Sequence, residues 1–303
     1  MKKLIIFLTI ILVACGGDKK QEEPPKIAVV ISTLNNPWFV ILAESAAENA
    51  RNLGYEAKIF DSQNNPALES DHFENLISSG FDAILFNSTD ADGSVTNVLK
   101  AKEAGVPVFC MDREINSNQA ATSQILSDNY SGCVSIGIEF VKALNGKGNY
   151  VEIMGVAGDN NTYARSNGFH SVVDQYPDLH LLAQQPGDFD RNKSLNVMES
   201  LLQANQDIQA VFCGNDAMAM GAYQAIKSAG LLNKIKIFGF DGTEEVIQKI
   251  KEGEIQATGM QYPLIMAKTA AEYADKYIKG ERNFPQYVPV AVDLINSKTA
   301  KHF

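Results

Sequence analysis

The stretch that decides the fold is KIAVVISTLNNPWFVILAESAAENARNLGYEAKIFDS, residues 26–62. It begins with a nearly continuous apolar run, residues 26–32, whose lack of polar alternation is typical of a strand covered on both faces. A helical pattern follows over residues 39–53, and Gly54 marks its end. A second β-rich run occupies residues 56–62. The stretch therefore predicts two parallel strands joined by a helix.

The same alternation of β-rich runs and helical patterns continues along the chain to about residue 296. The remaining β-rich runs are residues 83–87, 106–112, 124–128, 150–155, 180–186, 210–216, 236–241, 257–261 and 289–295. With the first two they make eleven candidate strands, more than one open sheet usually holds. We therefore predict the α/β class, with two doubly wound parallel-sheet lobes of about six strands each. The less regular residues 114–128 and 259–263, and the stretch around 288–293, are candidate crossings between the lobes.

The N-terminus has the pattern of a bacterial lipoprotein export signal. Lys2 and Lys3 precede an apolar run over residues 4–14 that is too short to span a bilayer stably. The sequence LVAC, which ends at Cys15, matches a lipoprotein cleavage box, and this similarity implies cleavage before Cys15 and lipid on its sulfur. We therefore predict a signal peptide at residues 1–14 and a lipidated polar tether at residues 15–25. A plain secretory signal with an incidental cysteine is the alternative.

The charge balance and the cysteines argue against several other classes of protein. With 26 basic and 36 acidic residues, the net charge of −10 disfavours nucleic acid and anionic membrane surfaces as partners. Cys110 and Cys213 lie in apolar, strand-like runs, and neither they nor Cys133 form a CxxC pair. Buried free thiols fit this placement better than a zinc site, so we predict no metal and no cofactor.

Polar and aromatic residues gather where one predicted strand after another ends. Asn36 follows the first strand, Asn87 the third, and Asp112 and Arg113 the fourth. Others follow strands in the second half of the chain: Arg165, Phe189, Asn215, Asp241 and Gln261. Ligands of open α/β sheets bind at the carboxyl ends of the strands. We therefore expect these residues to converge on one edge of each lobe, with the two edges face to face.

The types of these side chains suit an uncharged sugar. A hydroxyl both donates and accepts hydrogen bonds, so carboxylates such as Asp112, guanidinium groups such as Arg113 and side-chain amides can all bind it. The flat C–H faces of a sugar ring need apolar partners, which Trp38, Phe39 and Phe189 supply. Two aspartates and two arginines leave the site roughly neutral, which disfavours a sugar phosphate. The structural alternatives are helix caps for the asparagines, core packing for the rings and a surface ion pair for Asp112 and Arg113.

Segments across nearly the whole chain after the tether resemble one family, and they occur in the same order. They are VISTLNNPWF, DSQNNPA, NSTDADG, MDRE, QQPGDFDRNKSLNVMESLL, AVFCGNDAMAMGA, FGFDGTEE and ATGMQYP. The chain resembles the ribose-binding members of the type I periplasmic binding protein family, which serve ABC importers. The resemblance implies ligand contacts at Asn36, Phe39, Asn87, Asp112, Arg113, Arg165, Phe189, Asn215, Asp241 and Gln261. Trp38, which we add to this site, stands where the family usually has phenylalanine, and its larger ring leaves the exact sugar open.

The resemblance also implies a three-segment hinge, with crossings near Ser127, Gln261 and Val290. On this basis the N-terminal lobe comprises residues 26–126 and 262–290, and the C-terminal lobe comprises residues 127–261 and 291–303. The family's mode of action implies a monomeric, extracytoplasmic protein that closes on ribose and delivers it to an ABC permease. Its contact with the membrane is limited to the lipid on Cys15. The ligand could also be ribitol, xylitol, allose, galactose or a furanose-like signal molecule.

The residues argue against an enzyme and against a transcriptional repressor. FDGT, residues 240–243, is similar to part of a phosphatase box, but Gly239 stands where the nucleophilic aspartate of that box would be. The four histidines are scattered and join no motif, so we predict no catalysis. A sugar-responsive repressor would need a DNA-binding head before the first strand, where this chain has a signal and a tether.

Overall fold

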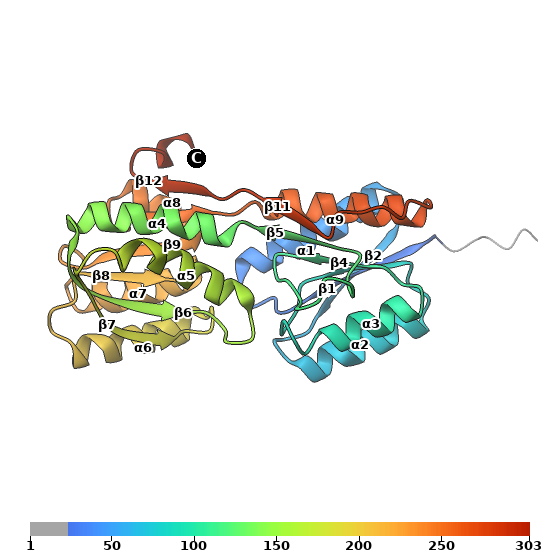
Figure 1. Ribbon diagram of the computed structural model, residues 1–303, viewed down its shortest axis with the longest axis horizontal. Helices are drawn as coiled ribbons and strands as arrows, with labels where there is room; N and C mark the ends of the chain where they lie inside the picture. Colours follow the sequence, from blue (N-terminus) through green and yellow to red (C-terminus); the bar gives the residue numbers. More distant parts are fainter. Residues whose placement is uncertain (1–23) are drawn as a thin grey trace, which may run out of the picture.

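The computed structural model describes residues 24–303; the predicted signal peptide and Cys15 lie outside these residues. The chain forms two lobes that lie side by side, each built on a six-stranded sheet with helices on both faces (Figure 1). We call the body around the sheet β11-β5-β4-β3-β1-β2 the first lobe, and the body around β12-β10-β9-β8-β6-β7 the second lobe. The prediction of two doubly wound α/β lobes is thus confirmed.

The first lobe holds a wholly parallel sheet. Its strands are β1 (Lys26–Ile31), β2 (Glu56–Asp61), β3 (Ala83–Phe86), β4 (Val108–Met111), β5 (Ser123–Ser127) and β11 (Tyr287–Val290). Its helices are α1 (Pro37–Asn52), α2 (Pro66–Ser78), α3 (Val95–Glu103) and α9 (Pro263–Ile278).

Strand β1 shows why the opening run lacks polar alternation. Ile27, Val29 and Ile31 face the core beneath α1 and α9, whereas Ala28 and Val30 face the core beneath α2 and α3. Since both faces of the strand are covered, every position from Ile27 to Ile31 is buried and apolar. Alanine-rich faces of α1 and α9 pack together in the first of these cores, because small side chains let two helices approach closely.

The second lobe holds a mostly parallel sheet. Its strands are β6 (Lys147–Met154), β7 (Asp178–Pro186), β8 (Ala210–Cys213), β9 (Lys236–Asp241), β10 (Ala257–Met260) and β12 (Asp293–Asn296). Its helices are α4 (Asn129–Leu144), α5 (Asn160–Val173), α6 (Arg191–Ala204), α7 (Asp216–Ser228), α8 (Glu244–Lys251) and the 3₁₀ turn η1 (Ala300–His302). Helices α6, α7 and α8 cover one face of the sheet, while α4 and α5 cover the other over a cluster of aromatic rings.

The predicted strand at residues 289–295 is wrong as a single strand. It consists of β11 in the first sheet and β12 in the second, and Ala291 and Val292 connect them. Strand β11 ends at the carboxyl edge of the first sheet and continues straight into the carboxyl edge of the second sheet, which faces it. Strand β12 therefore runs antiparallel to its neighbour β10, whereas all other strand pairs are parallel.

The chain passes between the lobes three times within the described residues. The passages lie between β5 and α4, between β10 and α9, and between β11 and β12 (Figure 1). Cys110, Cys133 and Cys213 are buried and free, as the sequence predicts. Of the helices within residues 24–303, none combines the length and the apolar character that crossing a bilayer requires.

Candidate functional site

The carboxyl ends of the two sheets face each other and enclose a narrow chamber between the lobes. Its cavity volume is about 10 Å³, roughly the room that one water molecule needs. Nine of the eleven predicted ligand-contact residues line it: Asn36, Trp38, Phe39, Asp112, Arg165, Phe189, Asn215, Asp241 and Gln261. Residues from both lobes therefore converge on one small space, as their positions at strand ends predict.

Two of the amides in the chamber also cap helices. The Oδ1 atom of Asn36 accepts a hydrogen bond from the backbone N–H of Trp38 at 3.0 Å, at the start of α1. The Oδ1 atom of Asn215 accepts one from Met218 at 2.9 Å, at the start of α7. Because an amide carries its acceptor and its donors at opposite ends, the cap fixes the rotamer and leaves Nδ2 of each residue for a ligand.

The buried carboxyl group of Asp112, directly after β4, accepts a hydrogen bond from Asn87, which lies behind it. Asn87 does not line the chamber; its Nδ2 donates to Oδ2 of Asp112 at 3.2 Å, and its Oδ1 accepts from the hydroxyl of Ser32 at 2.6 Å. The second carboxyl oxygen of Asp112, Oδ1, has no hydrogen-bond partner among the described residues. Burial raises the pKa of Asp112 to about 7, although Arg165 acts in the opposite direction.

A second buried carboxyl group, on β9, is oriented by a neighbouring amide. The Nε2 atom of Gln261 donates to Oδ1 of Asp241 at 2.7 Å. Burial raises the pKa of Asp241, and Arg165, whose Nη1 lies 3.7 Å from Oδ1, again opposes this shift. The Oε1 atom of Gln261 has no partner within the described part of the chain.

The two arginines come from different lobes, Arg165 from the second and Arg113 from the first. Arg165 donates to the side chain of Asn129 and to the backbone carbonyl of Gly214, each at 2.8 Å. Arg113 lines the wider cavity next to the chamber and forms a buried ion pair with Asp159, with 2.7 Å between Nε and Oδ2. Since the two groups of this pair come from opposite lobes, it also joins the lobes.

The aromatic rings come from both sides of the chamber. Trp38 and Phe39 begin α1 in the first lobe and pack edge to face, with ring centroids 5.6 Å apart. Phe189 comes from the second lobe, and its ring lies directly over Gly155, where an added Cβ would come within 2.0 Å of the ring. The guanidinium group of Arg113 lies 4.9 Å from the centre of the Phe39 ring and 5.8 Å from that of Phe189.

Three non-glycine residues of the chamber have positive backbone φ angles. These are Asp112 at 65°, Phe189 at 57° and Asp241 at 130°. Such angles are uncommon for residues with side chains and cost energy that the surrounding structure must compensate. Their concentration in one chamber supports the assignment of this place as the functional site, because strained residues cluster at such sites.

Sequence reasoning missed two residues that line the chamber, Asp159 and Asn161. Asp159 caps α5, and the Nδ2 atom of Asn161 donates to the backbone carbonyl of Asp112 at 3.3 Å. The sequence GDNN before α5 carries the signal that could have found them: acidic and amide residues directly after a strand. Asp159 adds a third carboxyl group to the two aspartates and two arginines that the sequence predicted for the site. This carboxyl group forms an ion pair with Arg113.

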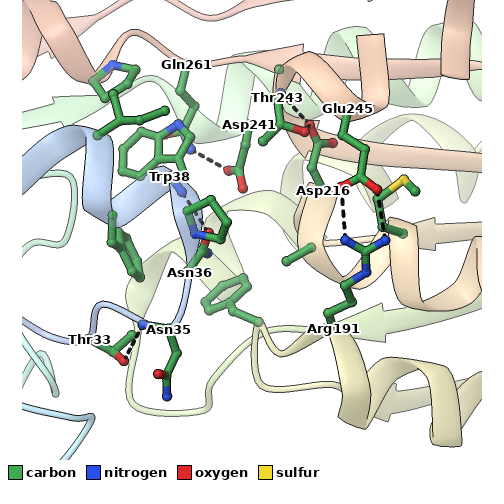
Figure 2. Close-up of a pocket in the computed structure, with 18 of the residues that line it drawn as sticks. Thr33, Asn35, Asn36, Trp38, Arg191, Asp216, Asp241, Thr243, Glu245 and Gln261 are labelled. Carbon is green, nitrogen blue, oxygen red and sulfur yellow. Dashed lines mark hydrogen bonds and ion pairs between the residues drawn. The ribbon is translucent and has the colours of Figure 1, made fainter. Parts of the chain in front are cut away.

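A wider cavity of about 880 Å³ opens beside the chamber (Figure 2). The side chains of Asn36 and Trp38 form one wall, and the ion pair between Arg191 and Glu245, at 2.9 Å, lies on the opposite wall. Asp241 and Gln261 lie between them, where the chamber and the wider cavity meet. The wider cavity thus adjoins the chamber on this side.

On another side of the chamber the lobes touch each other directly. The backbone N–H of Ala91 donates to the carbonyl of Gly158 at 2.8 Å, and Nδ2 of Asn160 donates to Asn116 at 2.6 Å and to Glu114. We call these bonds, together with the Arg113–Asp159 pair, the interlobe contact. It closes this side without any ligand atom.

Comparisons with known proteins agree with this architecture. The periplasmic binding protein domain family matches residues 27–282. The ribose import binding protein of Salmonella typhimurium is 40% identical over 269 residues, which cover 89% of this chain and 90% of that protein. The D-apiose import binding protein of Paraburkholderia graminis is 38% identical over 275 residues, which cover 90% of this chain and 88% of that protein.

A solved structure gives the same result at the level of the fold. The periplasmic solute-binding protein of an ABC transporter from Actinobacillus succinogenes, solved with bound D-allose, superposes with a TM-score of 0.86 at 27% identity. The match covers 92% of this chain and 100% of that chain. The chain belongs to the periplasmic binding protein domain family and is a solute-binding protein, not an enzyme.

Proposed function

We propose that this chain is the extracytoplasmic binding protein of a sugar ABC importer and that it binds ribose, or another small neutral sugar, between its lobes. The observation that carries the proposal is the composition of the chamber: aromatic rings, amides, carboxyl groups and a guanidinium group from both lobes line one space. Rings can cover the C–H faces of a sugar, while the polar groups bind its hydroxyls. The ribose-binding relative, at 40% identity, supports the same ligand class.

Binding proceeds through opening and closure of the two lobes. A chamber of about 10 Å³ is too small for a sugar ring, so the lobes must separate before the ligand enters. We infer that the three passages between the lobes, near Ser127, Gln261 and Val290, act as the hinge. A ligand shifts the equilibrium toward the closed form only by binding that form more tightly, and contacts to both lobes provide this preference.

The exact sugar is the part of the proposal that needs a direct measurement. Relatives named for ribose and for D-apiose are about equally similar to the chain, at 40% and 38% identity. Trp38, in place of the usual phenylalanine, changes the shape of the pocket wall. Isothermal titration with ribose, apiose, allose, galactose, ribitol and xylitol distinguishes the candidates. We expect one sugar to bind at one site per chain with a Kd of about 1 μM or lower, or roughly −8 kcal/mol.

A matched pair of variants tests the place of binding. Asp241→Asn removes a carboxylate of the chamber and should weaken binding of the preferred sugar at least about tenfold, since a charge-assisted hydrogen bond contributes about 1.5–3 kcal/mol. Asp178→Asn changes the same chemistry at the exposed start of β7 and should leave the affinity unchanged. Equal affinities of the two variants would refute the chamber as the site. Silence of the natural protein toward every neutral sugar and polyol would refute the function.

We further propose that the mature protein is a monomer held at a bacterial membrane by lipid on Cys15. The LVAC sequence at residues 12–15 supports this anchor. Mass spectrometry of the protein from a bacterial membrane fraction should find an N-terminal peptide that begins at a lipid-modified Cys15. A mature N-terminus at any other residue would contradict the lipoprotein assignment.

A further inference from the structure

The indole N–H of Trp38 is a buried polar group without a partner. The residue is 4% exposed, and its Nε1 atom has no hydrogen-bond partner among the described residues. Buried donors are almost always paired in proteins, and leaving one unpaired is unfavourable because it loses its hydrogen bonds to water. An unpaired donor in the wall of a chamber indicates a group that can donate to a bound ligand.

The other unpaired atoms around the chamber have complementary chemistry. Asp112 Oδ1 and Gln261 Oε1 are also buried and without a partner, and both are acceptors. The chamber therefore presents one fixed donor and two fixed acceptors that the protein itself leaves unsatisfied. A polyhydroxylated ligand can satisfy all three, because each hydroxyl both donates and accepts.

We propose that Trp38 is a specificity-determining residue whose Nε1–H donates a hydrogen bond to one oxygen of the bound sugar. A phenylalanine at this position can cover the sugar face but cannot donate. The inference deepens the proposed function and rests on it. It assigns the ligand an acceptor oxygen at the edge beside the start of α1, so the site selects against an analogue that lacks this oxygen.

The neighbouring amide supplies a competing partner. Trp38 and Gln261 lie next to each other in the wall of the cavity (Figure 2), and Gln261 holds Asp241 through its Nε2. Its Oε1 has no partner either and could accept a hydrogen bond from the indole N–H. If the indole N–H bonded Gln261, it would be satisfied with or without sugar, and its environment would not depend on the ligand.

The composition of the chain makes the experiment specific. Trp38 is the only tryptophan among the 303 residues, so protein labelled with ¹⁵N-tryptophan gives one indole N–H resonance. Titration calorimetry first identifies the preferred sugar. On its addition, we expect this resonance to shift downfield and its exchange with water to slow. A series of monodeoxy analogues should contain one member that binds but leaves the resonance close to its ligand-free position.

An isosteric replacement of the indole tests the energy of the bond. Incorporating benzothienylalanine in place of tryptophan exchanges the N–H for sulfur at this single position and preserves the ring shape. Affinity for the preferred sugar should fall about fivefold to tenfold, as expected for one hydrogen bond. Affinity for the informative deoxy analogue should stay unchanged, because the oxygen that receives the bond is already missing.

The outcomes separate this inference from the proposed function. If a sugar binds tightly but the indole resonance is unmoved, or if the sulfur analogue binds every sugar as the natural protein does, Trp38 is only a stacking surface and the inference is wrong. If the protein with benzothienylalanine loses the same affinity for the preferred sugar and for every monodeoxy sugar, the cause is packing and the inference is again wrong. If no neutral sugar or polyol binds the natural protein, the proposed function fails and this inference fails with it.

Discussion

At the residue scale, the two asparagines of the chamber show how a helix cap can also orient a polar group that lines a cavity. Asn36 and Asn215 each use Oδ1 to cap a helix and direct Nδ2 away from that cap. From the sequence, capping and ligand binding are competing explanations for an asparagine before a helix. In the structure the two explanations do not exclude each other, because the cap gives the amide one rotamer and so orients the remaining Nδ2.

The sequence predicted the lining of the chamber better than the layer behind it. Residue type and position at a strand end suffice for Asp241 or Phe189, which point into the space between the lobes. They do not suffice for Asn87, which satisfies the same pattern but lies behind Asp112. Which member of a polar pair faces a cavity depends on packing between adjacent strands, and a linear pattern does not contain that information.

The raised pKa of Asp112 predicts opposite pH dependences for binding and for stability. Its folded pKa of about 7 exceeds its ordinary value of 3.8, so the folded, ligand-free protein binds the proton more tightly than the unfolded chain. The free energy of unfolding should therefore rise as pH falls from about 7 toward 4. A carboxylate accepts stronger hydrogen bonds from sugar hydroxyls than the protonated group does. Affinity should therefore fall over the same range, by at most about tenfold per pH unit for one proton.

Calorimetric titrations and denaturant unfolding between pH 5 and 8 test this prediction. Asp112→Asn, which imitates the protonated group, should remove the contribution of Asp112 to both pH dependences, whereas the exposed Asp178→Asn should change neither. The contributions of Asp241 and Asp216, whose pKa values burial also raises, remain in both variants. Arg165, Arg113, Asp159 and Asp241 act electrostatically on Asp112 and remain in the variant. An affinity that rises on acidification would show that protonated Asp112 is the form that binds the ligand.

At the element scale, an ion pair between half-buried His170 and buried Glu152 joins α5 to β6. The Nε2 atom of His170 lies 2.9 Å from Oε2 of Glu152, whose side chain is 2% exposed, and Nδ1 lies 2.8 Å from Asp174. Gln184 of β7 donates to the same glutamate oxygen at 2.6 Å. The hydrogen bond to Glu152 is the main cause that raises the pKa of His170 to about 9.

His170→Gln should lower the free energy of unfolding by about 1–2 kcal/mol near pH 6, because glutamine can replace the hydrogen bond but not the charge. The folded pKa lies above the ordinary 6.5, so the stabilisation is complete below 6.5 and is lost as pH rises through about 9. Unfolding curves at pH 6, 8 and 10 should show the difference from the natural protein shrinking. His180→Gln, on the exposed side of β7, is the matched control. A difference that stays constant up to pH 10 would mean that packing, not charge, is responsible.

The close contact between α4 and α5 predicts that a larger residue at Gly168 destabilises the fold. Helices α4 and α5 meet at Gly168, where an added Cβ would come within 2.3 Å of the backbone carbonyl oxygen of Tyr130. Gly168→Ala should lower the free energy of unfolding by about 1–3 kcal/mol, despite the better helix propensity of alanine. Chemical denaturation measures this, with Asn167→Ala, at an exposed position of the same helix, as the control. A stabilised Gly168→Ala protein would show that the helices can separate slightly without cost.

The strands and helices could be predicted because their signals are local. Buried parallel strands need continuous apolar runs, and the helices of this chain carry caps and terminal glycines, such as Gly54 with its φ of 97°. The division of residues 289–295 between two sheets did not follow from their local pattern, which is that of one strand, although the less regular stretch and the resemblance indicated a crossing near Val290. Both halves are apolar and extended, and the sheet to which a strand belongs is decided by contacts far away in sequence.

At the scale of the whole molecule, the interlobe contact joins the two lobes in the arrangement that the structure shows. The Arg113–Asp159 pair and the bonds of Asn160 join loops that follow β4 and β6, and none of them needs a ligand atom. If the protein closes on a sugar as proposed, these contacts favour closure in addition to what the sugar contributes, and the affinity should include their free energy. The two-lobed arrangement could be read from the number of strands, but a contact between two loops leaves no periodic signal in a sequence.

Gly158 offers a way to change closure without touching the ligand. Its backbone carbonyl accepts the hydrogen bond from Ala91, and an added Cβ would come within 2.1 Å of Oδ2 of Asp90 in the opposite lobe. Asp90 cannot move easily, because its Oδ1 accepts from the backbone N–H groups of Asp92 and Gly93. Gly158→Ala should therefore weaken sugar binding about tenfold or more, which corresponds to about 1.4 kcal/mol.

The stability of the ligand-free variant separates this effect from damage to the fold. Gly158 has no positive φ angle, so alanine does not strain its backbone, and the clash disappears when the lobes part. The melting temperature without sugar should thus stay close to that of the natural protein, while the increase caused by sugar becomes smaller. Ala157→Ser, at the exposed neighbouring position, should bind sugar normally. If Gly158→Ala binds sugar with unchanged affinity, the loops do not meet in the bound state, and closure must follow a path other than this contact implies.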